Sequence, residues 1–218
     1  GALSLGLNQI RLTRRHKKEA ETDALTGLFN RRAFFDQANL SQSTASVVVV
    51  VFDIDHFKLV NDSHGHQIGD NVLRTFALTV SDAIRDEDVA ARLGGEEFGL
   101  VLPNASLQTA LLVSERIRKR FSERRFLSEG RLFGCTVSAG ISKAGRIGDL
   151  EAMMVQADAA LYVAKRSGRD RVILSSRDDL RISSSRGERI EPADSTMGTT
   201  VDIAPRIAQR KARLTRPH

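Results

Sequence analysis

The sequence contains one cysteine, one tyrosine and no tryptophan. The single cysteine, Cys135, excludes an internal disulfide and fits a reducing compartment. Its neighbours, Gly134, Thr136 and Val137, favour a buried strand residue over a reactive thiol. Because Tyr162 is the only Tyr or Trp, the chain also has little of the aromatic surface on which single-stranded nucleic acids stack.

Long hydrophobic runs are absent as well. No stretch reaches the roughly 20 consecutive apolar residues that cross a bilayer. Residues 1–10 are mostly apolar and are followed at once by a basic run over 11–18, an order that resembles the cytoplasmic end of a membrane helix. An amphipathic linker helix explains the same pattern. Either interpretation indicates a piece of a longer protein. We expect a cytoplasmic domain with a sensory or membrane domain upstream.

The middle of the chain lacks net charge, although the whole sequence has a formal charge of +6 and a pI near 10.0. Residues 1–22 carry five Lys or Arg against two acids, and residues 175–218 carry nine against six. Residues 23–174 therefore hold 19 charges of each sign. This balance argues against a nucleic-acid partner, while it allows a local phosphate site.

Length and composition predict one catalytic domain with appendages, which we place at residues 23–174. The polar, helix-favouring stretch before it predicts a linker helix within 1–22, and the Ser, Gly and Pro residues after it predict a disordered tail over 175–218. Within the domain, the continuous apolar run 47–52 predicts a strand covered on both faces. The other expected strands are 89–92, 98–102, 136–142 and 171–174, and the expected helices are 31–39, 69–84, one capped by Asn104 or Ser106 that runs to Phe121, and 149–167. Interleaved strands and helices predict an α/β (α+β) fold with a mixed sheet under helices.

Two aspartates, Asp53 and Asp55, follow the buried strand directly. A carboxylate at the end of a covered strand is costly to leave unpaired, so a hard divalent cation is a good candidate to bind there. Two solvated turn residues, or the nucleophile of a phosphatase, would give the same short pattern. The pair alone therefore leaves three interpretations open.

A hairpin is expected to turn through Gly94 and Gly95 and to continue with Glu96 and Glu97. Glycines let a backbone approach a bulky ligand, and adjacent acids repel one another unless a cation arrives. If the hairpin lies beside the Asp53 strand, at the usual spacing of about 4.8 Å, Glu97 and Asp53 can share one metal. A second ion roughly 3.5–4 Å away would complete a clamp for phosphoryl transfer. An ordinary polar turn is the alternative.

Several motifs stand in the order found in the GGDEF family, which the chain resembles from about Asp23 to Leu174. The signature is Arg92-Leu93-Gly94-Gly95-Glu96-Glu97-Phe98, in the Glu-for-Asp form that active members also use. The other matching segments are Asp23-Ala24-Leu25-Thr26-Gly27-Leu28, Asn30-Arg31-Arg32, Phe52-Asp53-Ile54-Asp55-His56-Phe57-Lys58, Asn61-Asp62, Gly65-His66, Gly69-Asp70, Ala157-Asp158, Ala160-Leu161-Tyr162, Ala164-Lys165 and Gly168-Arg169.

The resemblance implies a diguanylate cyclase that condenses two GTP molecules into cyclic di-GMP and two pyrophosphates, on a palm-type fold with a central mixed, mainly antiparallel sheet flanked by helices. It also implies Mg²⁺ or Mn²⁺ as cofactor. The implied metal ligands are Asp53, Glu97, the main-chain carbonyl of Ile54, and Glu96, which also serves the 3′-hydroxyl. The implied substrate-binding residues are Asn61 and Asp70 for guanine, Lys58, Lys165 and Arg169 for phosphate oxygens, and Phe57, Gly94 and Gly95 around the nucleotide. The implied catalytic residues are Asp53, Glu96, Glu97 and Lys58.

This reaction predicts a homodimer, because the 3′-oxygen of each GTP must meet the α-phosphate of the other. The linker helix is then expected to pair the chains and to raise the effective concentration of the half-sites. The resemblance also places an inhibitory site for the product at Arg85 and Asp88, joined by Arg116; a plain charged loop is the alternative. The alternative function is a catalytically silent receptor for cyclic di-GMP, and the intact acidic residues argue against it.

Two features depart from the family pattern or give no signal. Asp170 stands where the family more often has Asn, which puts a negative charge near the expected phosphate-binding end. The segment 126–133 has no interpretable feature. His64 and His66 lack the Cys or third His that would complete a zinc shell, so they are expected to be loop residues.

Overall fold

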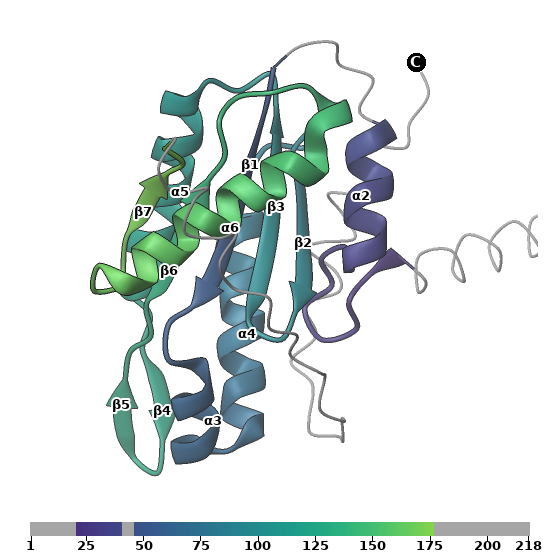
Figure 1. Ribbon diagram of the computed structural model, residues 1–218. Coiled ribbons are helices and arrows are strands. Elements are labelled where there is room, and N and C mark those ends of the chain that lie inside the picture. Colours follow the sequence, from purple (N-terminus) through teal and green to yellow (C-terminus); the bar gives the residue numbers. More distant parts are fainter. Residues whose placement is uncertain (1–20, 41–45, 177–218) are drawn as a thin grey trace, which may run out of the picture.

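The computed structural model describes residues 21–40 and 46–176 of the chain, drawn in colour in Figure 1. The expected linker helix over residues 1–22 and the expected tail over 175–218 fall almost entirely outside these ranges. Within the described part, no helix combines the length and the apolar character needed to cross a membrane.

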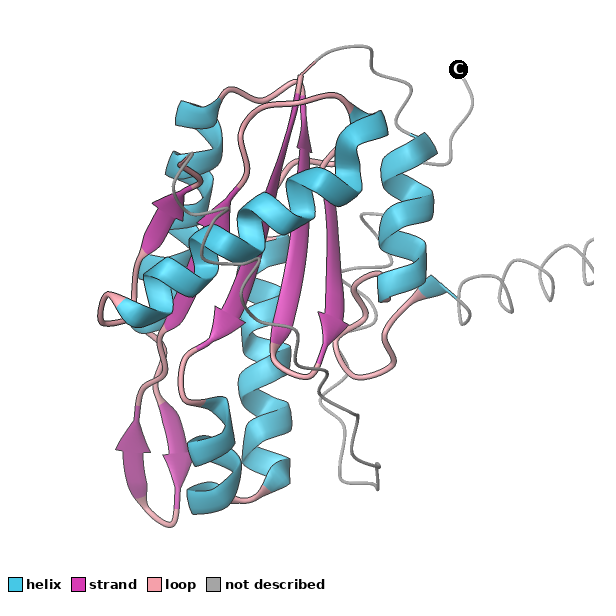
Figure 2. Ribbon diagram, in the orientation of Figure 1, coloured by secondary structure: helices cyan, strands magenta, loops and turns pink. Residues whose placement is uncertain are grey.

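A five-stranded sheet forms the centre of the molecule, in the order β2-β3-β1-β6-β7. Its pairings are antiparallel except for that of β6 with β7. The prediction of a mixed, mainly antiparallel sheet flanked by helices is therefore confirmed (Figures 1 and 2). The elements are α2 (Arg31–Leu40), β1 (Val47–Ile54), α3 (Phe57–His64), α4 (His66–Ser81), β2 (Val89–Gly94), β3 (Glu97–Pro103), α5 (Leu107–Ser122), β4 (Phe126–Ser128), β5 (Arg131–Phe133), β6 (Val137–Ile141), a 3₁₀ turn (Ile147–Asp149), α6 (Leu150–Arg166) and β7 (Val172–Leu174).

The central strand β1 is made by the continuous run of valines. All of its residues are buried, and successive side chains point to opposite faces of the sheet. The set that begins with Val48 packs with α4 and α5, and the set that begins with Val47 packs with α2 and α6. Figure 1 shows these two helix pairs on opposite faces of the sheet. Asp53 lies an even number of residues from Val47, so it belongs to the face covered by α6.

Helix α6 lies directly on β6 at Gly140. A side chain at this position would overlap the main chain of Ala157 and Leu161, so the approach requires glycine. The close contact fixes α6 against the sheet. As a result Lys165, about two turns further along the same helix, is held over the end of β1.

The segment without an interpretable pattern forms a small hairpin of β4 and β5. Its turn passes through Glu129 and Gly130 with φ angles of 48° and 75°. Positive φ at both positions is typical of the two-residue turns whose twist suits a hairpin. Each strand has only three residues, which is too short for an alternating pattern to be recognised in the sequence.

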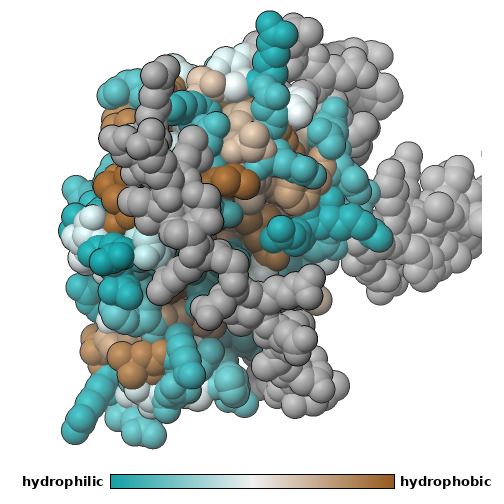
Figure 3. All heavy atoms as spheres, viewed as in Figure 1, coloured by the Kyte–Doolittle hydropathy of each residue, from teal (hydrophilic) through white to brown (hydrophobic). Residues whose placement is uncertain are grey.

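Aromatic packing attaches this hairpin to the rest of the domain. The ring of Phe133 stacks on that of His64 with centroids 4.1 Å apart, and Nδ1 of His64 lies 3.0 Å from Oγ of Ser128. On the outer side Leu127 and Leu132 are 62% and 68% exposed, and apolar side chains gather at the lower left of Figure 3. His64 therefore holds the hairpin, and the expectation that it lies in a loop is wrong.

Other local expectations also change. His66 begins α4 and is not a loop residue, and the short helix α3 was not expected. Cys135 is buried as predicted but precedes β6, so it is not a strand residue. Burial raises the pKa of its thiol to about 11, which disfavours the reactive thiolate. Of the two candidate caps for α5, Ser106 is used, because its Oγ accepts the amide of Thr109 at 3.0 Å.

Candidate functional site

The carboxylates predicted to share a metal come from neighbouring strands. In the antiparallel pairing of β1 with β3, Asp53 stands opposite Glu97. The amide of Ile54 donates to the carbonyl of Glu96 at 3.3 Å, so the hairpin tip continues alongside the end of β1. The structure thus brings together the three acidic residues and the Ile54 main chain, although the two segments that carry them are more than 40 positions apart in the sequence.

Asp53 is a buried charge that the protein itself compensates only in part. Its side chain is 7% exposed, and Oδ2 lies 2.7 Å from Nζ of Lys165. Burial raises the pKa of Asp53 to about 6; the ion pair with Lys165 opposes this shift, and the charges of Glu96 and Glu97 add to it. The net rise means that the site holds the ionised carboxylate at a cost, which an added cation would reduce.

The glycines of the signature make an open turn at the tip of the β2–β3 hairpin. Gly95 has φ of 44°, a left-handed conformation that favours glycine, and a Cβ placed there would meet no atom within 4 Å. The space above the turn is therefore accessible to a ligand that approaches the backbone. Both Gly94 and Gly95 are exposed, beside the half-buried Glu96 and the exposed Glu97.

Arg92 holds this turn in place. Its Nε donates to the carbonyl of Gly95 at 2.9 Å, and its Nη1 lies 3.3 Å from both carboxylate oxygens of Asp23. Asp23 in turn accepts the amide and the hydroxyl of Thr26 at 2.9 and 2.6 Å. The opening motif of the domain therefore braces the signature turn. Both motifs are visible in the sequence, but Arg92 and Asp23 are 69 positions apart, so neither motif indicates that they pair.

Asp158 is a further acid of the site that the sequence reasoning left without a role. It precedes Lys165 by seven positions on α6, so the two lie on the same side of that helix. The residue as a whole is exposed, but desolvation of its carboxyl, followed by the charge of Glu97, raises its pKa to about 6, against the opposing charges of Arg31 and Lys165. The helical spacing of Asp158 and Lys165 was the signal that could have identified it.

The donor atoms at this site fit a hard divalent cation. No three His, Cys, Asp or Glu side chains in the described residues 21–40 and 46–176 form a metal-binding group by themselves. Mg²⁺, however, is commonly held by one or two carboxylates, with phosphate oxygens and water in the other positions. Asp53 and Glu97 on adjacent strands, with the main chain of Ile54 beside that of Glu96, match that requirement.

The predicted guanine-binding residues lie on the helix pair α3 and α4. Asn61 is half-buried on α3, and its Oδ1 occupies the space that a side chain at Gly69 of α4 would fill. The ring of Phe57 reaches the same point, with Cζ 3.3 Å from that position. Asp70 follows Gly69 and is half-buried, whereas Lys58 is exposed on the first turn of α3. The structure therefore brings Asn61, Phe57 and the Gly69-Asp70 pair together.

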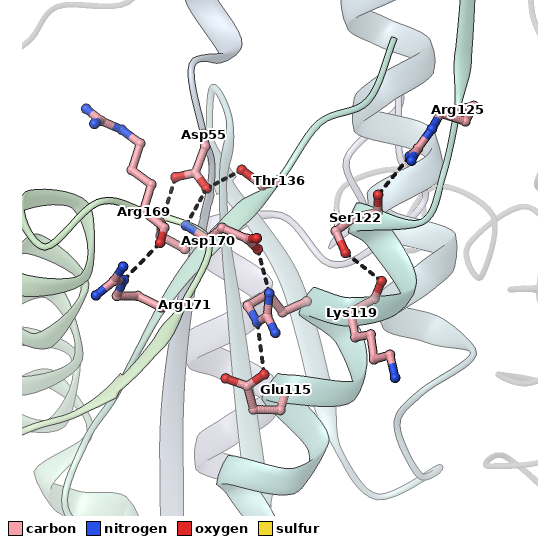
Figure 4. Close-up of polar contacts among 11 residues, drawn as sticks. Asp55, Glu115, Lys119, Ser122, Arg125, Thr136, Arg169, Asp170 and Arg171 are labelled. Carbon is pink, nitrogen blue, oxygen red and sulfur yellow. Dashed lines mark hydrogen bonds and ion pairs between the residues drawn. The ribbon is translucent and has the colours of Figure 1, made fainter. Parts of the chain in front are cut away.

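The second aspartate after β1 has a different environment from the first. Asp55 accepts hydrogen bonds from the hydroxyls of Thr136 and Ser138, both at 2.7 Å, and from the amide of Asp170 at 3.1 Å (Figure 4). These bonds anchor the segment that follows α6, which includes Arg169, to the end of β1. Asp55 is therefore a structural anchor, while Asp53 faces Lys165.

The predicted inhibitory residues are also neighbours. Asp88 is buried and its Oδ2 accepts the amide of Arg85 at 2.7 Å, while the Arg85 guanidinium lies 3.0 Å from Glu87. Arg116 of α5 donates to the carbonyl of Ala83, two residues before Arg85. The structure thus places Arg85 and Asp88 in the loop that follows α4, where Arg116 of α5 contacts the same loop.

Known proteins are similar to this chain in sequence and in fold. The family model described as "Diguanylate cyclase, GGDEF domain" matches residues 20–171. The response regulator PleD of Caulobacter vibrioides is 42% identical over 162 residues, which cover 71% of this chain but only 36% of PleD. The GGDEF domain of DgcB from Caulobacter crescentus, solved in complex with c-di-GMP, is 36% identical with a TM-score of 0.68, over 72% of this chain and 96% of that one. The active GGEEF domain of a diguanylate cyclase from Vibrio cholerae is also 36% identical, with a TM-score of 0.59 over 68% and 97%.

Proposed function

The chain belongs to the GGDEF family, and on that basis we propose that it is a diguanylate cyclase that condenses two GTP molecules into cyclic di-GMP and two pyrophosphates. The observation that carries the proposal is the pairing of Asp53 with Glu97 across β1 and β3, beside Lys165. The similarity to the active GGEEF domain supports it further, because this chain has the same Gly-Gly-Glu-Glu-Phe sequence at its signature.

Asp53, Glu97 and the carbonyl of Ile54 are proposed to hold Mg²⁺ or Mn²⁺, with Glu96 serving a second ion or the 3′-hydroxyl. The cation, when bound, stabilises charge on the phosphate oxygens. The partly compensated carboxylate of Asp53 supports this role. Glu96 is proposed to take the proton of the attacking 3′-hydroxyl, a contribution typically worth about 10²–10⁴-fold in rate.

The rest of the chain is proposed to bind and orient GTP. Asn61 and Asp70 read guanine, because a carboxylate can accept hydrogen bonds from both N1–H and the 2-amino group, which adenine does not offer. Lys58, Lys165 and Arg169 hold phosphate oxygens, and Phe57 packs beside the base. The open turn at Gly94 and Gly95 supports the close approach of the nucleotide to the backbone. These assignments agree with the grouping of Asn61, Phe57 and Gly69 on α3 and α4.

The chemistry requires two copies of the domain. In each half-reaction the 3′-oxygen of one GTP forms a bond to the α-phosphorus of the other, and the bond from that phosphorus to pyrophosphate breaks. Two half-sites related by a two-fold axis satisfy this geometry. We therefore propose a homodimer, helped by the N-terminal segment. Deletion of residues 1–20 should lower turnover most at low enzyme concentration, whereas equal specific activity at every concentration would contradict a role of that segment in pairing.

Feedback inhibition by cyclic di-GMP is proposed to act through Arg85, Asp88 and Arg116. Guanidinium groups suit phosphate and guanine through their planar arrangement of donors. The contact of Arg116 with the loop that carries Arg85 and Asp88 supports a common ligand. We also propose a cytoplasmic location and an upstream sensory or membrane domain; this chain matches only 36% of the length of PleD.

The decisive experiment is incubation of the protein with GTP and Mg²⁺, followed by chromatographic separation of the nucleotide products. Two variants provide the comparison: Glu97→Ala, and Glu123→Ala, which removes an exposed glutamate after α5. We expect cyclic di-GMP from the wild type and from Glu123→Ala, and a loss of about 10²-fold or more in Glu97→Ala. Cyclic di-GMP binding without turnover by the dimeric wild type would instead identify the silent receptor.

A further inference from the structure

The turn between α6 and β7 has an uncommon backbone. Arg169 and Asp170 are consecutive non-glycine residues with φ angles of 62° and 44°. Such left-handed conformations are sparsely populated for residues with a side chain, and they persist only where the surrounding structure holds them. Arg169 is one of the proposed phosphate-binding residues. The contacts that hold this turn therefore also determine the position from which the Arg169 side chain extends.

Main-chain contacts hold one side of the turn. The amide of Arg169 donates to the carbonyl of Ala164 at 3.0 Å, and its carbonyl accepts from Nε of Arg171 at 2.9 Å. The amide of Asp170 donates to Asp55 at 3.1 Å. These bonds fix the backbone of the turn but leave the carboxylate of Asp170 to be paired by another group.

That group is Arg118 of α5, 52 residues earlier in the sequence. Its Nη1 lies 2.7 Å from Oδ1 of Asp170, and its Nε lies 2.9 Å from Glu115. The Arg118 side chain is only 22% exposed. Figure 4 shows Asp170 between Asp55 and the guanidinium that also contacts Glu115, while the side chain of Arg169 extends away from this group. The ion pair therefore occupies the Asp170 carboxylate and leaves the Arg169 guanidinium outside the network.

Charge makes this pairing important for the nucleotide. An unpaired carboxylate next to Arg169 would repel phosphate oxygens and would also compete for the Arg169 guanidinium. Arg118 supplies the opposite charge from a different element of the fold. The pairing explains how the chain can carry Asp at position 170, where an uncharged side chain would not repel phosphate oxygens.

We propose that Arg118 is a positioning residue of the active site: through Asp170 it fixes the turn that presents Arg169, and it neutralises a carboxylate that would otherwise oppose the phosphates of GTP. The inference rests on the proposed function, because the phosphate-binding role of Arg169 comes from that proposal. Arg118 touches neither the nucleotide nor the reacting atoms, and it acts through Asp170.

Four variants test this by charge compensation: Arg118→Gln, Asp170→Asn, the double variant, and Arg120→Gln as control. Arg120 is an exposed arginine of the same helix, so its replacement makes the same change of charge. Asn keeps the tolerance of Asp for left-handed backbone while it removes the charge. Binding of a non-hydrolysable GTP analogue with Mg²⁺ is measured by calorimetry, together with KM and kcat for cyclic di-GMP formation.

We expect Arg118→Gln to weaken analogue binding and to raise KM by about two- to fivefold, as for a partly exposed charge that solvent screens in part, with kcat within about twofold of wild type. Asp170→Asn should bind at least as tightly as wild type, the double variant should recover wild-type affinity, and Arg120→Gln should be unchanged. Failure of the double variant to recover, or equal behaviour of Arg118→Gln and Arg120→Gln, would overturn the inference.

The same measurements separate the inference from the proposed function. An inactive wild type that binds the analogue with the expected dependence on Arg118 would refute the cyclase proposal and retain the positioning role. An active wild type in which Arg118→Gln behaves like Arg120→Gln would refute the positioning role alone. A wild type that neither binds the analogue nor forms product would refute both.

Discussion

Replacement of Asp53 by asparagine is expected to stabilise the metal-free protein at neutral pH while it abolishes cyclase activity. Asparagine has nearly the shape of a protonated aspartic acid and carries no charge. Burial raises the pKa of Asp53 from 3.8 to about 6 even though Lys165 lies 2.7 Å away. The folded protein therefore binds the Asp53 proton more tightly than the unfolded chain does, and it loses this advantage when the proton leaves.

The magnitude follows from the two pKa values. The favourable contribution of the proton is fully present below pH 3.8 and is lost as the pH rises through about 6. At about 1.4 kcal/mol per pH unit, the shift from 3.8 to about 6 corresponds to about 3 kcal/mol at pH 7.5 and about 1 kcal/mol at pH 4.5. Asp53→Asn should exceed the wild type in free energy of unfolding by these amounts.

The assay is urea denaturation of both proteins at pH 4.5 and 7.5, first with a chelator and then with Mg²⁺. Asp36→Asn is the matched control, because Asp36 is an exposed aspartate on α2. Mg²⁺ should stabilise the wild type and the control more than Asp53→Asn, since a cation binds the folded carboxylate. A variant no more stable than wild type at pH 7.5, or a gain of equal size at both pH values, would refute this account of the site.

Three further predictions concern the surroundings of the site. Gly69→Ala should displace Asn61, raise KM for GTP by about tenfold and weaken discrimination against ATP, with little change in thermal stability; an unchanged KM would contradict the contact. Arg92→Gln should release the turn at Gly95, lower kcat/KM for cyclic di-GMP formation and cost about 1–2 kcal/mol in urea unfolding, and unaltered kinetics would remove its bracing role. Arg85→Ala should relieve inhibition in an assay with added cyclic di-GMP, whereas an unchanged inhibition curve would remove the proposed product site.

The sequence by itself determined the elements whose patterns are long or unbroken. The valine run of β1 predicts a strand covered on both faces, because no face of it is polar. The apolar stripe of α6 and the Gly94-Gly95 turn predict a helix and a hairpin in the same way. Asp53 and Glu97 were expected on adjacent strands if the hairpin lies beside β1. The register of β1 with β3 shows that it does.

Three short elements, β4, β5 and α3, were not predicted from the sequence. The strands of the β4–β5 hairpin have three residues each and α3 has eight, too few to repeat a pattern. Their stability comes from tertiary packing, for example the stacking of Phe133 on His64. No pattern within α3 or within the β4–β5 hairpin predicts this contact.

Only the tertiary structure decided what each charged residue does. Asp53 and Asp55 are two positions apart in the sequence, yet one meets Lys165 of α6 and the other meets Thr136 and Ser138 at the start of β6. Asp170 appeared from the sequence to bring an opposing charge to the phosphate end, but the fold pairs it with an arginine of α5. The reason is physical: local sequence sets helix and strand through periodic burial, whereas a charge is governed by whichever groups the fold brings within a few ångströms of it.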